Sequence, residues 1–426
     1  MQVRIAYGTE GRLLEVPDHS SVITPNELPG LDDEVGAVAA AIHRPSSGRG
    51  LGQLVNATTT VAVVFPDLTR PMPNRTVLPP LLRSLADLGV PDQRITLLCA
   101  TGTHRQATRA EMEELVGAEI VARYAIVDHQ SDGDQHLHVG SVDGVPVRLQ
   151  REYVEADVRI ITGFVEPHFF AGFSGGPKAV CPGLAATETI LEAHHPRRIA
   201  DDRSTFVHRH GNPVHDFVRQ AVALCPPHLS VDVTINQKRQ ITAVFAGELV
   251  ATHDAACAFA EASAVQRVEA PFDVVVSTNG GYPLDRNLYQ AVKGMAAAER
   301  IVRPGGIIIL AAACLDGVPD GGAFAHMLSA ARSAPDLVAA SGGPELDRWQ
   351  AQVLGRVLEK AEVWLYSDGL SDQRTQEALL RPVRDLSRAV AEAAIRTGGS
   401  RVAVLPEGPL TVATVVPPGR SPTLVM

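Results

Sequence analysis

Short, continuous runs of apolar and β-branched residues recur along this chain, and each is followed by a polar loop and a helix-like segment. The runs cover residues 61–65, 95–99, 158–162, 274–277 and 307–311. Because their hydrophobicity is unbroken rather than alternating, we expect strands covered on both faces, as in a parallel sheet with crossover helices. The pattern predicts an α/β fold with mainly parallel sheets.

The length of 426 residues is enough for two or three domains. A new strand begins in "RVEAPFDVVVST", so we expect an N-terminal cofactor-binding and catalytic domain at 1–267. A second α/β domain at 268–404 is expected to close over the substrate, with the active-site cleft between the two domains. Whether 405–426 returns to the first domain is left open. One helix is expected over 376–397.

Composition excludes several classes of protein. A formal net charge of -10 argues against a surface for nucleic acid or for an anionic membrane. The longest apolar run, 307–314, is too short to span a bilayer. Five scattered cysteines fit reduced thiols better than a disulfide framework, and the start "MQVRIAYGTE" lacks a signal-peptide pattern. We therefore expect a soluble cytoplasmic protein.

Polar residues gather directly after four of the predicted strands. The four segments are "PDLTRPMPNR", "ATGTHR", "GFVEPHFFAGFSGGPK" and "TNGGYPLDRNLYQAVKG". In open α/β sheets, ligands bind outside the carboxyl ends of the strands. The four loops therefore predict one cleft to which both domains contribute.

In the first three loops, each candidate residue has a structural and a functional interpretation. Asp67 and Arg70 form either a local ion pair or a grip for a carboxylate or phosphate. His104 is either a structural loop histidine or a base. His168 lies beside two phenylalanines, which suits a packed histidine as well as an acid–base group.

Lys178 lies in "SGGPKAVCPG", where Gly175 and Gly176 allow the backbone to approach a bound group closely. The amine is suited to clamping a phosphate or to covalent attachment, although the spacing is not that of a Walker A loop. His194 and His195 end a short helix, where they either interact with its dipole or ligate a metal.

The fourth loop leads into a helix with Gln290 and Lys293 on one face, which is either a solvated surface or part of a site. Trp349 lies in a later helix-like segment and is by default a core residue.

Taken together, "DLTRP", "TGTHR", "EPHFFAGFSGGPKAVCPG", "HHP", "LYQAVKGM" and the helix bearing Trp349 resemble the lactate racemase family. These motifs occur in the family's order and extend over nearly the whole chain. The resemblance implies a nickel-dependent 2-hydroxyacid racemase or epimerase.

The resemblance also implies a cofactor. In the family, a nickel-pincer nucleotide is tethered to a lysine by a thioamide, and the matching residue here is Lys178, in a loop where Gly175 and Gly176 would make room for the nucleotide. A histidine completes the square-planar nickel site, and the family spacing favours His194 over His195. Cys181 is either a packing residue or a soft group near the metal.

The acid–base histidines of the family match His104 and His168. Arg70 and Lys293 match residues that hold the substrate carboxylate. Asp67 matches the acidic member of the first motif, and Gln290, Tyr289 and Trp349 match residues that line the pocket. The resemblance implies inversion of C2 by reversible hydride transfer, with one histidine on each side of the substrate.

Three alternatives stay open. The same chemistry suits malate, a longer or aryl 2-hydroxyacid, or a sugar acid epimerised at C2. A metal-free enzyme would use Lys178 as a Schiff base, and a non-catalytic hydroxyacid-binding protein would need neither histidine as a base. The expected partners are the small-molecule substrate and cofactor-maturation enzymes, with no nucleic acid and no membrane.

Overall fold

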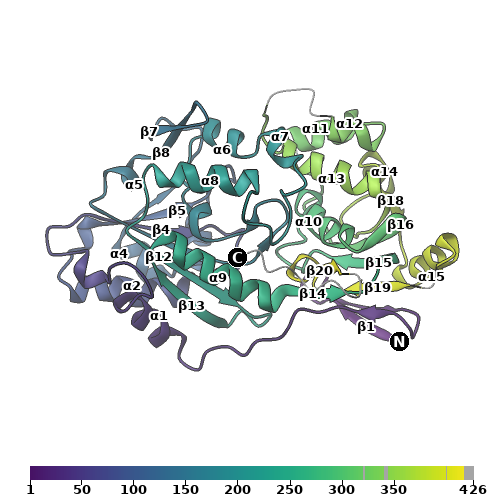
Figure 1. Ribbon diagram of the computed structural model, residues 1–426, viewed down its shortest axis with the longest axis horizontal. Coiled ribbons are helices and arrows are strands. Elements are labelled where there is room, and N and C mark those ends of the chain that lie inside the picture. Colours follow the sequence, from purple (N-terminus) through teal and green to yellow (C-terminus); the bar gives the residue numbers. More distant parts are fainter. Residues whose placement is uncertain (320–321, 340–343, 400, 417–426) are drawn as a thin grey trace. The chain divides into compact units, whose positions relative to one another are not determined.

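The computed structural model describes residues 1–319, 322–339, 344–399 and 401–416. The chain forms two compact units (Figure 1): unit 1 consists of Met1–Asn26 and Ala264–Met426, and unit 2 of Glu27–Ser263. Both units are α/β, and their main sheets are mostly parallel, so the predicted fold class is confirmed.

Unit 2 is built around a six-stranded sheet of order β13-β12-β9-β4-β5-β6, in which only the β12–β13 pair is antiparallel. Its elements are α1 (Glu34–His43), η1 (Leu51–Gln53), β4 (Val61–Pro66), α2 (Asn74–Asp87), η2 (Asp92–Arg94), β5 (Ile95–Ala100), α3 (Arg109–Val116), α4 (Ala118–Arg123), β6 (Ala125–Asp128), β7 (His136–Val142), β8 (Val145–Gln150), α5 (Arg151–Glu155), β9 (Val158–Phe164), β10 (Pro167–His168), β11 (Gly172–Phe173), η3 (Gly176–Ala179), α6 (Thr187–Ala193), α7 (Pro196–Ile199), α8 (Pro213–Ala223), β12 (Leu229–Ile235), β13 (Ile241–Gly247) and α9 (Leu249–Ala264).

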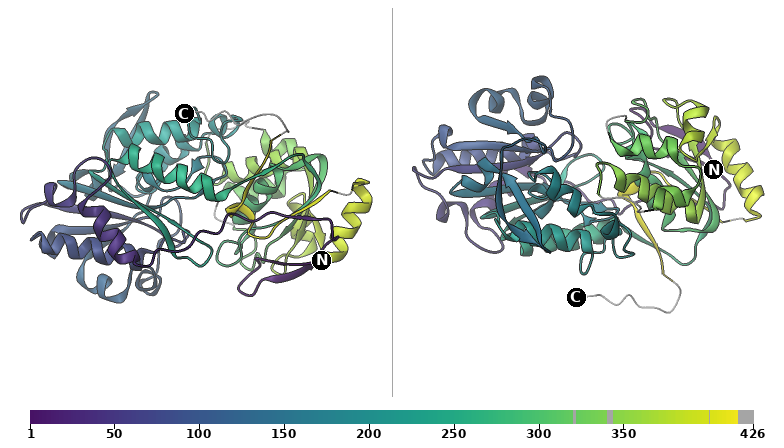
Figure 2. Two further views of the ribbon diagram at one scale, coloured as in Figure 1. Left: turned by 60° about the horizontal axis from the view of Figure 1, so that its bottom comes forward. Right: turned by 90° about the horizontal axis from the view of Figure 1, so that it is seen from above.

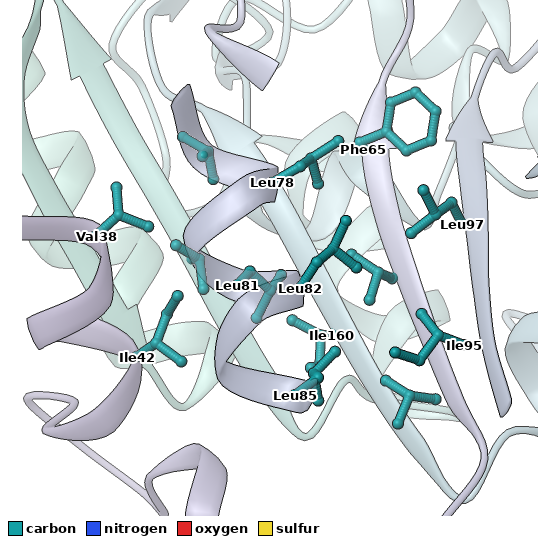
Figure 3. Packing of buried hydrophobic residues seen from close by; sticks show 14 of the residues in the cluster. Val38, Ile42, Phe65, Leu78, Leu81, Leu82, Leu85, Ile95, Leu97 and Ile160 are labelled. Carbon is teal, nitrogen blue, oxygen red and sulfur yellow. The ribbon is translucent and has the colours of Figure 1, made fainter. Parts of the chain in front are cut away.

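Strand β4 shows why its sequence is apolar without interruption. Val63 and Phe65 belong to a core cluster on one face of the sheet, whereas Ala62 and Val64 belong to a cluster on the other face. Figure 3 shows the first cluster, where Leu78, Leu81, Leu82 and Leu85 of α2 pack over β4, β5 and β9. Both faces of the strand are therefore buried, as the sequence pattern predicts.

Unit 1 contains a second six-stranded sheet of order β18-β17-β16-β15-β19-β3, which is parallel throughout. Its elements are β1 (Gln2–Ile5), β2 (Arg12–Glu15), β3 (Ser21–Val22), β14 (Val265–Val268), β15 (Phe272–Thr278), α10 (Leu288–Glu299), β16 (Val302–Ala311), α11 (Ala323–Ala330), α12 (Ala334–Val338), α13 (Arg348–Lys360), β17 (Ala361–Tyr366), α14 (Asp372–Glu377), β18 (Arg381–Val383), α15 (Leu386–Thr397), β19 (Val402–Leu405), η4 (Gly408–Leu410) and β20 (Val412–Val415).

The first 26 residues belong to unit 1 and not, as the sequence led us to expect, to the N-terminal domain. Strand β3 pairs with β19, and the β1–β2 hairpin lies beside α15, where the Glu15 amide donates to Ser387 Oγ at 3.1 Å (Figure 2). The hairpin thus covers an apolar sheet face with Ile5 and Leu14. This packing over a long sequence separation has no local signal.

The two ends of unit 1 also differ from the expected boundaries. The expected break at 267/268 falls within β14, which pairs with β20 of unit 1. The boundary of unit 1 therefore lies before β14, at Ala264. Residues 405–416 stay in unit 1 and do not return to the first domain. Residues 417–426, the rest of the segment whose return was left open, lie outside the described residues.

The single helix expected over 376–397 is wrong. The structure has α14, then β18, then α15, because the segment containing Pro382 pairs as an edge strand with β17. Proline lacks the N–H that a helix interior needs, and a sheet edge tolerates it. Within the described part of the chain, no helix has the length and apolar character required to cross a bilayer.

Candidate active site

Three of the four polar loops leave one edge of the unit 2 sheet. Strands β9, β4 and β5 are parallel neighbours, so the loops after Phe164, Pro66 and Ala100 emerge on the same side. The amide of Gly102, in the loop after β5, donates to the carbonyl of Gly183 at 3.0 Å. The His104 loop and the Lys178 segment are therefore joined through their backbones.

The loop after β4 positions Asp67 against His104. His104 Nδ1 lies 2.8 Å from Asp67 Oδ2, and the Thr69 hydroxyl donates to Asp67 Oδ1 at 2.7 Å. Burial alone would raise the pKa of Asp67, but His104, Arg70 and Thr69 together outweigh burial and lower it. Because an ionised carboxylate only accepts, His104 donates from Nδ1, and in the neutral ring the lone pair is therefore on Nε2.

Arg70 closes the turn that begins at Asp67. Its amide donates to the Asp67 carbonyl at 3.2 Å, and its Nη1 donates to the Thr69 carbonyl at 3.3 Å. The guanidinium is half-buried and contributes to the lowered pKa of Asp67. The structure therefore brings the cation, the carboxylate and the histidine of the first two motifs together.

His168 ends β10, which pairs with β11 in a tight hairpin. Its Nδ1 accepts from the Ala171 amide at 3.3 Å and more weakly from the Phe170 amide at 3.5 Å. In the neutral ring the proton is therefore on Nε2. The two histidines consequently have opposite neutral tautomers: His104 presents a lone pair on Nε2, and His168 presents an N–H there.

The ring of Phe170, which the sequence did not single out, lies among three candidate residues. It makes edge contacts with His168 and His194, at centroid distances of 4.5 and 5.4 Å, and lies 5.5 Å from the Lys178 amine. Asn212, the N-cap residue of α8, donates to the Phe170 carbonyl at 2.9 Å. The sequence signal for Phe170 was the pair of phenylalanines directly after His168 in "PHFF". Large apolar side chains in a loop are expected to be buried, and so to pack against neighbouring residues of that loop.

Gly175 and Gly176, which precede Lys178, are required by packing inside the protein. Both have positive φ values, of 73° and 48°. A Cβ on Gly175 would lie 2.6 Å from Val165, and one on Gly176 would lie 2.4 Å from the His253 ring. Packing against the chain's own side chains is therefore enough to require glycine at both positions, and the contact of Gly175 and Gly176 with a nucleotide stays a prediction.

His194 and His195 have different environments. His194 is 7% exposed, and its Nδ1 donates to the Ile190 carbonyl at 2.8 Å. Burial, and then the charge of Lys178, lower the pKa of His194 to about 3, so the ring is neutral with a lone pair on Nε2. His195 is half-buried, and its Nδ1 accepts from the Arg197 amide at 3.2 Å as the N-cap of α7.

A neutral imidazole oriented by a carbonyl is the usual form of a metal-ligating histidine. This geometry suits His194, whereas His195 is occupied as a helix cap. Cys181 is fully buried in the core with Val180 and Leu184. Burial raises the pKa of its thiol to about 12, which favours the packing interpretation of Cys181. Among the described residues, no group of three or more His, Cys, Asp or Glu side chains is arranged to hold a metal.

The fourth loop belongs to unit 1, where it leads into α10. Tyr289, Gln290 and Lys293 are half-buried on the first two turns of that helix. Trp349 of α13 is 6% exposed, and its Nε1 donates to the Tyr289 hydroxyl at 2.8 Å. The Tyr289 ring also contacts Phe324 of α11 at a centroid distance of 5.4 Å. Tyr289 and Trp349 are therefore brought together, with Trp349 largely a core residue.

Comparisons with known proteins show which family the chain belongs to. Residues 7–206 match the model of the lactate racemase N-terminal domain, and residues 266–415 match that of the lactate racemase C-terminal domain. A lactate racemase of Thermoanaerobacterium thermosaccharolyticum is 32% identical over 383 residues, which cover 88% of this chain and 89% of that protein. A lactate racemase of Lactiplantibacillus plantarum is 33% identical over 383 residues, covering 88% and 90%.

Solved structures give the same result. The lactate racemase apoprotein from Thermoanaerobacterium thermosaccharolyticum superposes with a TM-score of 0.90 at 30% identity, over 97% of this chain and 100% of that one. A protein from Thermotoga maritima shares the fold, with a TM-score of 0.69 at 17% identity over 91% of this chain and 100% of that one. With both domain models matched and the resemblance in the motifs confirmed, this chain belongs to the lactate racemase family.

Proposed function

We propose that this protein is an isomerase that inverts C2 of a 2-hydroxyacid, with lactate as the first substrate to test. Membership of the lactate racemase family supports the reaction class. The observation that carries the proposal is the arrangement in unit 2: a carboxylate-bound histidine, a second histidine of opposite tautomer, and a lysine electrostatically coupled to a buried neutral histidine.

A nickel-pincer nucleotide tethered to Lys178 is proposed as the cofactor. When bound, such a group supplies reversible acceptance of a hydride from C2, which makes C2 planar and open to inversion. The residues present fit it. A square-planar nickel needs four donors; a pincer group brings three of its own, through sulfur and carbon, and so would need only one from the protein. His194 would supply that single nitrogen, because its Nδ1 proton is held by the Ile190 carbonyl and its Nε2 carries the lone pair.

His104 and His168 are proposed as the acid–base pair. With its proton held at Nδ1 by Asp67, His104 has a lone pair on Nε2 that accepts a proton from a substrate hydroxyl. His168 holds its proton on Nε2 when neutral and donates a hydrogen bond there. Two groups that work from opposite faces suit a reaction whose substrate and product are mirror images.

Arg70 is proposed to bind the substrate carboxylate through its planar guanidinium. Tyr289, Gln290, Lys293 and Trp349 of unit 1 stay candidate substrate ligands. Their support is the family resemblance and, for Tyr289 and Trp349, the hydrogen bond that joins them. Loading of Lys178 is proposed to depend on cofactor-maturation enzymes supplied by the host.

The test uses protein co-expressed with a working maturation system and supplied with nickel. We expect enantiopure lactate to lose optical rotation, the peptide containing Lys178 to carry the nucleotide mass, and nickel to be bound. Lys178→Arg should lose the adduct. His104→Ala and His168→Ala should retain the adduct but lower kcat about a hundredfold or more. Racemisation without adduct or nickel would refute the cofactor, and full activity in both histidine variants would refute the acid–base pair.

A screen with malate and with aryl, longer and sugar 2-hydroxyacids tests the breadth of the substrate class. A Schiff-base enzyme predicts instead that borohydride traps a carbonyl substrate on Lys178 in protein that carries no nickel. A non-catalytic binding protein predicts hydroxyacid binding with no loss of optical rotation. These outcomes separate the three interpretations that the sequence leaves open.

A further inference from the structure

Asp128, the last residue of β6, contacts both ends of the loop that carries His104. The Thr101 hydroxyl donates to Asp128 Oδ1, and the Ala107 amide donates to Oδ2 at 2.6 Å. The side-chain amide of Gln106 donates to the Asp128 carbonyl at 2.8 Å. A single residue therefore binds the first residue and the last two residues of the segment 101–107.

The position of this carboxylate is fixed by the sheet. Asp128 is paired with Cys99 of β5 in parallel register, and the next amide, of His129, donates to the Cys99 carbonyl at 3.3 Å. Backbone pairing thus places Asp128 at a constant distance from the end of β5, where the loop starts. A loop whose two ends share one acceptor on a rigid strand has little conformational freedom at its apex.

His104 is near that apex. Its amide donates to the Thr101 carbonyl at 3.0 Å. Thr101 is therefore bonded both to Asp128, through its side-chain hydroxyl, and to the backbone of His104, through its carbonyl. The ring then reaches Asp67 at 2.8 Å. Asp67 orients the imidazole only if the backbone holds His104 in place, and that backbone is bonded to Thr101, whose hydroxyl donates to Asp128.

We propose that Asp128 is a positioning residue for His104, which holds the loop so that the ring keeps its hydrogen bond to Asp67 and its lone pair on Nε2. This inference rests on the proposed role of His104 as an acid–base group. The ionised carboxylate matters because both of its oxygens accept at once. An amide has one accepting oxygen, so in Asp128→Asn either the Ala107 amide loses its acceptor or the Thr101 hydroxyl is left with the longer bond to the Cys99 carbonyl, at 3.3 Å.

The experiment compares Asp128→Asn with two other variants. Thr101→Val removes one of the two donors while leaving Asp128 in place, and it keeps the test available if Asp128→Asn folds poorly. Asp132→Asn is the matched control, because Asp132 follows Asp128 by four residues and its side chain is exposed. Long-range proton–nitrogen NMR of histidine-labelled protein without substrate reports the His104 tautomer, with His104→Gln used to assign the signal.

We expect a single His104 tautomer in the parent protein and in Asp132→Asn, and a mixture of tautomers in Asp128→Asn and Thr101→Val. In cofactor-loaded enzyme, kcat should fall about fivefold to tenfold in both variants with KM within about twofold, since small displacements of a catalytic group cost rate rather than binding. A purely structural role would lower the melting temperature without changing the tautomer.

Unchanged tautomer signals, or an unchanged kcat, in Asp128→Asn and Thr101→Val would overturn the inference. The proposed function fails by a different result, namely full activity of His104→Gln. In that case the NMR comparison still decides whether Asp128 orders the ring.

Discussion

Replacing Asp67 by asparagine should disable His104 without removing it. In the structure the carboxylate is 7% exposed and accepts from His104 Nδ1 at 2.8 Å. The asparagine amide has only one accepting oxygen. If that oxygen accepts from the Thr69 hydroxyl, as Oδ1 of Asp67 does, the amide nitrogen faces His104 Nδ1 and cannot accept its proton. The His104 ring is then free to take the other tautomer, in which Nε2 carries the proton and cannot act as a base.

The size of the effect follows from the hydrogen bond. A hydrogen bond to a charged group contributes about 1.5–3 kcal/mol. Because the His104 side chain is 39% exposed, solvent weakens the interaction, and we take about 1.5–2 kcal/mol. Since about 1.4 kcal/mol corresponds to a factor of ten in rate, kcat should fall about 10- to 30-fold.

The assay follows the loss of optical rotation of enantiopure lactate with nickel-loaded enzyme, at saturating and limiting substrate. Asp202→Asn, an exposed aspartate on the same unit, serves as the control and should keep the parent kcat. The adduct mass on Lys178 has to be equal in all samples, so that loading does not contribute. A kcat within twofold of the parent in Asp67→Asn would refute the reasoning that the carboxylate sets the His104 tautomer.

Three further predictions follow from other parts of the structure. His194→Ala should lower bound nickel at least tenfold whereas His195→Ala should retain it, by metal analysis of protein with equal adduct mass, since only His194 is buried with its Nδ1 proton held by a carbonyl. Leu81→Ala, at a fully buried position of α2, should lower the free energy of unfolding by about 2–5 kcal/mol in denaturant titration; a loss below about 1 kcal/mol would mean that the core relaxes around the gap. Burial lowers the pKa of His215 to about 3. Between about pH 3 and pH 6.5 the unfolded chain therefore binds a proton at His215 that the folded protein does not. The stability contributed by this group is present above the unfolded pKa of about 6.5 and is lost as the pH falls toward 3. Its share of the slope is about 1.4 kcal/mol per pH unit; His215→Leu should flatten the curve, His210→Leu at an exposed site should not, and equal slopes would contradict the assignment.

The continuous apolar runs determined the fold class, because a strand buried on both faces needs apolar residues at every position, and β4 sends alternate residues into two cores. The strand ends then located the loops that carry Asp67, His104 and His168, since parallel neighbours end at one edge. The motifs were enough to identify the family. These features depend on local pattern and order along the chain, which a sequence displays directly.

Tertiary structure decided what depends on contacts between distant residues. The proposal of His194 rather than His195 as the nickel ligand rests on which ring is buried beside Lys178 and which caps a helix. Gly175 and Gly176 are glycines because Val165 and His253 occupy the space of their side chains. The first strands pair in unit 1, and Asp128 binds the His104 loop, through residues far apart in sequence. Hydrogen bonding and close packing act over a few ångströms in space, whatever the separation along the chain, so such roles become visible only once the chain is folded.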